Sequence, residues 1–111
     1  MKLWKTASNL ALTAVMAVAG ITASPTAVWA QDAQLARSLA ATCANCHGTN
    51  GNARGDMKSL AGVPADTTIA LLNAYKSGAL PATIMHQIAK GYTDEQVKLI
   101  ANYLAAQQPK Q

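Results

Sequence analysis

The chain has 111 residues, a formal net charge of +4 and hydrophobic residues at half of its positions. This length predicts one domain. Two of the nine basic residues, Lys2 and Lys5, lie in an N-terminal segment that we expect to be removed. The remaining seven basic and five acidic side chains give a charge of only +2. We therefore expect no nucleic-acid partner, since such partners are bound by strongly basic surfaces.

The N-terminal segment has the three parts of a secretory signal peptide. Two lysines supply a positive start, positions 10–23 are uncharged and mostly apolar, and Val-Trp-Ala at 28–30 precedes the expected cut. An uncleaved anchor is the alternative, but this run of 14 residues is shorter than the roughly 20 needed to span a bilayer. We predict that residues 1–30 are a cleaved signal peptide. Residues 31–111 would then form a periplasmic domain with no membrane span.

The first element of the mature domain is a helix predicted over about residues 32–46. Its apolar side chains recur at the spacing of one helical face. They are Leu35, Ala36, Leu39, Ala40 and Cys43. This face leads directly into the most informative motif of the chain.

That motif is Cys43-Ala44-Asn45-Cys46-His47, a C-x-x-C-H run. It is the attachment signature of c-type haem. Residues three apart share one face of a helix, so Cys43 and Cys46 can form thioether bonds to two vinyl groups of one porphyrin. His47 is then predicted as the proximal ligand of the haem iron.

Two cysteines also have other uses. A zinc site usually has four Cys or His ligands, and the second histidine, His86, lies far downstream. A thioredoxin-like dithiol follows a strand, and no strand-like stretch precedes Cys43. A structural disulfide stays open from the cysteines alone. Haem attachment is the preferred interpretation because the C-x-x-C-H run is its attachment signature.

Residues 48–62 are rich in glycine and have no apolar period, which predicts a loop. We expect this loop to run along the proximal side of the haem. A ligating histidine usually donates its other ring N–H to a carbonyl or carboxylate. Residues 57–59 are the predicted source of that carbonyl for His47.

Three further helices are predicted after the loop. The first is capped by Asp66 or Thr67 and ends at Gly78, and the second covers residues 82–90 and ends at Gly91. The third begins with Thr93-Asp94-Glu95-Gln96, a capping box. Its apolar face comprises Val97, Ile100, Ala101 and Leu104. The chain is therefore predicted as all-α, with four to five short helices around one haem.

The mature domain would contain three tyrosines as its only aromatic side chains, because both tryptophans lie in the predicted signal peptide. A domain of this size often needs a metal or covalent staple to be stable. A buried haem would fill the core, so we expect the haem-free chain to be largely unfolded.

The distal iron ligand has three candidates. Met57 lies only ten residues after His47, in the loop expected on the proximal side. Met85 lies 38 residues after His47, far enough for the chain to return on the opposite face. His86 is its rival, but neighbours on a helix point about 100° apart, so both cannot face the iron. We predict Met85, since His and Met together are common axial ligands in cytochromes c.

These features together resemble class I cytochromes c. In that family the N- and C-terminal helices cross beside the haem, which implies that Leu39 and Ala40 pack against Ile100, Tyr103 and Leu104. A narrower resemblance is to the cytochrome subunit of flavocytochrome c sulfide dehydrogenases. The runs at 41–51, 59–62, 75–78 and 81–96 carry it, and the last is the most specific.

The narrower resemblance implies that this chain is not catalytic alone and receives electrons from a sulfide-oxidising FAD subunit. It would then pass them to a downstream acceptor protein. Two departures from the family pattern matter. Lys58 stands where relatives usually have proline, so the loop should be less rigid, but a backbone carbonyl can still bind His47. The chain has only one haem motif, whereas some relatives have two haem domains, and this weakens the partner assignment. Two other functions remain open, a free electron shuttle to an oxidase or reductase and a haem protein that binds ligands or has peroxidatic activity.

Overall fold

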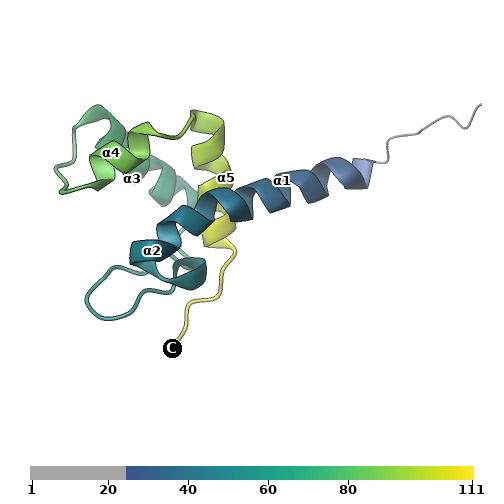
Figure 1. Ribbon diagram of the computed structural model, residues 1–111, viewed down its shortest axis with the longest axis horizontal. Coiled ribbons are helices and arrows are strands. Elements are labelled where there is room, and N and C mark those ends of the chain that lie inside the picture. Colours follow the sequence, from purple (N-terminus) through teal and green to yellow (C-terminus); the bar gives the residue numbers. More distant parts are fainter. Residues whose placement is uncertain (1–24) are drawn as a thin grey trace, which may run out of the picture.

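The computed structural model describes residues 25–111, with side chains from residue 29 onward. The elements in chain order are α1 (Pro25–Ala40), the 3₁₀ turn η1 (Ala41–Cys43), α2 (Ala44–His47), the 3₁₀ turn η2 (Thr49–Gly51), α3 (Ala65–Ser77), α4 (Met85–Lys90) and α5 (Asp94–Ala105). No strand occurs in residues 25–111. The all-α prediction is confirmed (Figure 1).

The core forms where α1 crosses α5 (Figure 1). Ala40 on α1 meets Ile100 and Leu104 on α5, and none of these residues is more than 4% exposed. The small Ala40 side chain lets the two backbones approach closely. Leu39 and Tyr103 pack at the margin of this cluster. The helix crossing implied by the resemblance to class I cytochromes c is therefore present.

α5 has the cap and the buried face that the sequence predicts. The backbone N–H of Gln96 donates to Thr93 Oγ1 at 3.2 Å, and Thr93 N–H donates to Gln96 Oε1 at 3.0 Å. These bonds satisfy two of the N–H groups that a helix start leaves unpaired. All four residues of the predicted face, Val97, Ile100, Ala101 and Leu104, are 1% exposed or less.

The N-terminal helix differs from its predicted bounds. It is already helical at Pro25, the first described residue, ahead of the predicted start near residue 32. It also stops as an α-helix at Ala40 and tightens into the 3₁₀ turn η1. Backbone dihedrals stay right-handed across the change, at φ −68° for Ala40 and −67° for Cys43. The chain therefore keeps its direction while its hydrogen bonds shorten from i→i+4 to i→i+3.

The start of α3 was predicted wrongly. Neither Asp66 nor Thr67 caps it, because the helix begins at Ala65 after Pro64, which has an extended ψ of 137°. Asp66 instead lies in the first turn, where its charge still suits the positive helix end. Gly78 ends the helix in the left-handed conformation at φ +81°, as predicted.

α4 is shorter than the predicted element over residues 82–90. It begins only at Met85, because Ile84 has a non-helical φ of −134°. It ends before Gly91, as expected.

α3 and α5 are joined by an ion pair between Lys76 Nζ and Asp94 Oδ1 at 3.0 Å. Within residues 25–111, no helix is both long and apolar enough to cross a membrane.

Candidate functional site

The C-x-x-C-H run lies at the end of the N-terminal helical arm, in η1 and α2. Cys43 is half-buried and packs against the cluster of Ala40, Ile100 and Leu104, whereas Cys46 is exposed. Both thiols are free. Burial raises the pKa of the Cys43 thiol. It therefore stays protonated at neutral pH, a form that oxidises less readily than a thiolate.

His47 is the last residue of α2, and its ring is held from one side. The distance from His47 Nδ1 to the carbonyl oxygen of Lys58 is 2.7 Å. A carbonyl can only accept, so Nδ1 carries the proton and donates it. In the neutral ring, Nε2 is then left with a free lone pair. This is the protonation state that an iron ligand requires, and the acceptor lies in the predicted segment 57–59.

Met57 lies in the loop segment that contacts His47, because it directly precedes Lys58, whose carbonyl accepts from His47 Nδ1. Its side chain is 46% exposed. That Met57 is not the distal ligand stays a prediction.

The loop can pass close beneath His47 because Gly48 follows it. Gly48 has φ +77°, and a Cβ built there would lie 1.9 Å from the carbonyl oxygen of Asn52. The loop also tightens at Asn50, which is not glycine but adopts φ +55°. Asparagine tolerates this conformation better than most residues. The chain thus turns sharply after the motif and returns toward it.

Met85 and His86 open α4 and face different sides. His86 lines a cavity of about 300 Å³ with Tyr75 and Lys90, and Met85 does not. The Nδ1 atom of His86 is buried and has no hydrogen-bond partner among the described residues. Both side chains are half-buried. This divergence agrees with the 100° spacing of helix neighbours and separates His86 from the position of Met85.

The packing and the donor set both suit a haem. Among the side chains described from residue 29 onward, Ile100, Leu104 and Val97 are the large ones that are fully buried, while Ile84 is 55% exposed and Leu71 is 38% exposed. A domain with so little buried apolar surface gains from a large apolar cofactor. Within the described part, no three His, Cys, Asp or Glu side chains converge to hold a bare metal ion. The zinc alternative therefore has no support.

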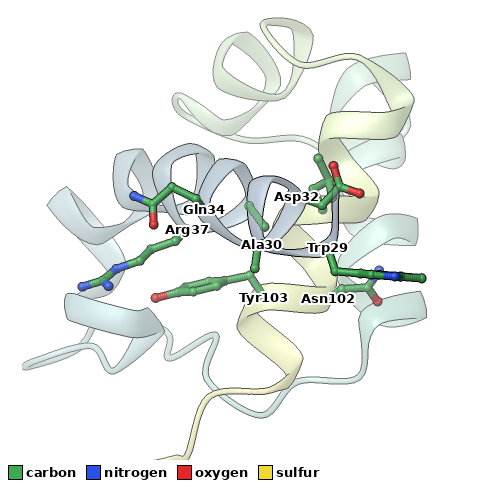
Figure 2. Close-up of a pocket in the computed structure, with 10 residues that line it drawn as sticks. Trp29, Ala30, Asp32, Gln34, Arg37, Asn102 and Tyr103 are labelled. Atoms are coloured by element: carbon green, nitrogen blue, oxygen red, sulfur yellow. The ribbon is translucent and has the colours of Figure 1, made fainter. Parts of the chain in front are cut away.

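A second cavity lies away from the motif. It is a groove of about 680 Å³ between α1 and α5, lined by Trp29, Ala30 and Arg37 on one side and Asn102 and Tyr103 on the other (Figure 2). No cysteine, histidine or methionine lines it. Cleavage after residue 30 would also remove part of its wall. We therefore do not assign the chemistry of the protein to this groove.

Residues 33–108 match the cytochrome c family. The chain belongs to this family. Its match covers α2, the loop and the three following helices, so the C-x-x-C-H run has the structural context that it requires. The cytochrome carries one covalently attached haem c, and Cys43 and Cys46 fit the attachment motif. It is a class I cytochrome c.

Three bacterial relatives resemble this cytochrome. The cytochrome subunit of sulfide dehydrogenase of Chlorobaculum tepidum is 40% identical over 65 residues, which is 59% of each chain. Cytochrome c-552 of Acidithiobacillus ferridurans is 38% identical over 58% of this chain and 28% of its own length. Cytochrome c-553 of Desulfomicrobium norvegicum is 31% identical over 62% of this chain and 90% of its own. The chain thus spans less than two thirds of the first two relatives.

Proposed function

We propose that Cys43 and Cys46 form the thioether bonds to the haem and that His47 and Met85 are its axial ligands. The hydrogen bond from His47 Nδ1 to the Lys58 carbonyl carries this assignment, because it leaves the lone pair of Nε2 free to bind iron. Met85 is supported by its half-buried position at the start of α4 and by the different orientation of its neighbour, His86.

The bound haem supplies the one-electron chemistry. The chain holds the group, excludes water around it and adjusts its potential. The 2.7 Å bond to Lys58 orients the ring of His47 and increases the basicity of Nε2, which favours the oxidised iron. Met85 acts in the opposite direction, because a thioether ligand raises the reduction potential. With two protein ligands the iron is closed to other ligands, which suits electron transfer rather than peroxidatic chemistry.

We propose that the electron donor is a sulfide-oxidising flavoprotein subunit containing FAD. The similarity to the cytochrome subunit of sulfide dehydrogenase supports this partner. The run at 81–96, which carries the narrower sequence resemblance, contains Met85 and the capping box of α5. In such a complex the cytochrome is the electron-transfer subunit, and the oxidation of sulfide occurs on its partner.

A free-standing shuttle is the second candidate. It is supported by the match to cytochrome c-553, which spans 90% of that protein. A chain with one haem motif also suits a protein that diffuses between a donor and an oxidase or reductase.

We further propose that the protein is exported to the periplasm and cleaved after Ala30. Most of the predicted signal peptide, residues 1–24, lies outside the described residues. Support comes from α1, in which Ala36 is the first buried side chain among those described from residue 29 onward, and Trp29 is 75% exposed. Removal of Trp29 and Ala30 would therefore shorten α1 without opening the core. The intact mass of the purified holoprotein tests the cut, and a retained leader would contradict it.

Purification from the native host under mild conditions separates the two functions. The flavoprotein proposal predicts that an FAD protein copurifies and that sulfide reduces the haem in the complex. The flavoprotein proposal fails if the haem protein purifies alone and sulfide does not reduce it after the fraction with the flavoprotein is added back. The shuttle would then be the remaining candidate. Rapid carbon monoxide binding to the native reduced protein would contradict both.

A further inference from the structure

The segment after α5 folds back along the proximal loop, beside which it descends in Figure 1. Asn52 holds the two together. Its Nδ2 donates to the carbonyl of Gln108 at 3.2 Å, and its Oδ1 accepts from the backbone N–H of Lys110 at 2.7 Å. The side-chain amide of Asn52 thus pairs with one carbonyl and one N–H of the main chain, as a peptide group would.

Backbone hydrogen bonds close the base of the loop next to Asn52. The carbonyl of Gly51 accepts from both Leu60 N–H, at 2.7 Å, and Ala61 N–H, at 3.0 Å. Pro109 covers the end of the loop so closely that a Cβ on Gly62 would lie 2.8 Å from Pro109 Cγ. The base of the loop is therefore fixed both to itself and to the segment after α5.

The tip of the loop has far fewer restraints. Residues 54–59 are all exposed. Within the described part, their hydrogen bonds are the contact between Ser59 Oγ and Ala53 N–H, at 3.0 Å, and the contact between the Lys58 carbonyl and His47. Lys58 also leaves its own φ free, whereas a proline would fix it near −65°. The position of the Lys58 carbonyl therefore depends on how firmly the base is held.

We propose that Asn52 is a positioning residue for the haem: by clamping residues 108–110 to the base of the loop, it holds the Lys58 carbonyl against His47 and so lowers the reduction potential. The connection runs from Asn52 to its neighbour Ala53, then through Ser59 to Lys58. This inference rests on the proposed role of His47 as the proximal ligand. A looser hydrogen bond makes Nε2 less basic and stabilises the oxidised iron less.

Two substitutions in the holoprotein break the clamp, one at each partner. Asn52→Ala removes both bonds, and Lys110→Pro removes the donated N–H, together with the lysine charge, while leaving the loop sequence intact. Both are expected to shift the midpoint potential upward and to increase the exchange rate of the His47 Nδ1 proton severalfold, as measured by NMR. Because they break the same contact, the double variant should shift the potential no further than Asn52→Ala alone.

Asn73→Ala is the matched control, since Asn73 is exposed on α3 and its side chain makes no hydrogen bond within the described residues. It should leave both readouts unchanged. If Asn52→Ala or Lys110→Pro lowers the stability of the folded holoprotein while the potential and the proton exchange stay at wild-type values, the inference is overturned. The NMR spectrum of the wild-type protein distinguishes this outcome from a failure of the assignment of His47 as an iron ligand. If His47 is not the ligand, its ring protons will lack the large upfield shift caused by the haem in the reduced state.

Discussion

His47 is held by an acceptor that lies eleven positions further along the chain. The acceptor is a backbone carbonyl, so its identity does not depend on the side chain of Lys58. This explains why the segment 57–59 could be predicted although Lys58 replaces the expected proline. A loop that returns toward the motif must pass the histidine, and some carbonyl in it becomes the partner of Nδ1.

Met85→Ala tests the distal ligand. In the oxidised holoprotein we expect the methionine-to-iron charge-transfer band to disappear and the reduction potential to fall, because the thioether favours the reduced iron. His86→Ala is the control and should keep the band, since His86 faces the cavity beside α3. A band that persists in Met85→Ala would refute the assignment.

Gly48→Ala should destabilise the holoprotein by about 3 kcal/mol, because the left-handed backbone is strained by a side chain and the new Cβ meets a main-chain oxygen. Gly55→Ala is a matched substitution at φ +64°, where a Cβ meets nothing within 4 Å. It should cost only about 1 kcal/mol. Chemical denaturation of the two variants measures the difference, and equal losses would contradict the close approach at Gly48.

The contacts of Asn50 and Asn52 had no sequence signal. Tyr103 Oη donates to Asn50 Oδ1 at 2.8 Å, across 53 positions of the chain. Asn52 binds Gln108 and Lys110, which lie 56 and 58 positions further along. Such pairs depend on where the folded helices place the loop, and no local pattern records that. The Asn-Gly pair at 50–51 predicts only a turn.

Among the elements, α5 was predicted best because its signals are local. Its cap, first-turn acidic residues and buried face all lie within twelve residues. α3 shows the limit of the same reasoning. Asp66 and Thr67 have capping side chains, but Pro64 already sets the chain direction and starts the helix at Ala65. The backbone restriction at proline prevailed over side-chain preference.

Thr93→Ala should lower the stability of the holoprotein by about 1 kcal/mol, because the N-terminal N–H groups of α5 lose their acceptor. Thr67→Ala removes the same atoms at an exposed site that caps nothing, and it should change stability by less than about 0.5 kcal/mol. Denaturant titration of both variants provides the comparison. An equal effect at the two sites would show that the capping box adds no stability.

At the scale of the whole molecule, the protein core is too small to stand alone. Within residues 29–111, three large side chains are fully buried, and the rest of the buried apolar set is alanine, comprising Ala36, Ala40, Ala61, Ala89 and Ala101. The composition predicted this shortage, since three tyrosines are the only aromatic residues after position 30. Haem binding and folding should therefore be coupled.

A variant with Cys43→Ala and Cys46→Ala tests that coupling, because it cannot attach haem covalently. Purified without haem, it should show a large loss of far-UV circular dichroism and no cooperative thermal transition. The wild-type holoprotein under the same conditions is the reference. Native-like helix content in the haem-free variant would mean that the α1–α5 crossing is stable without the cofactor.

The ion pair between Lys76 and Asp94 has a kinetic consequence, because the pair is neutral as a whole and adds nothing to the long-range attraction of an acidic redox partner. Residues 31–111 carry a net charge of only +2, so that attraction is weak. Encounter should then be governed by diffusion and short-range fit. We expect the second-order rate constant for electron transfer to fall by less than about tenfold as ionic strength rises to the physiological range. In stopped-flow measurements, Lys76→Ala, which leaves Asp94 unpaired, should slow this reaction about as much as Lys90→Ala, which removes an exposed charge that forms no ion pair within residues 25–111.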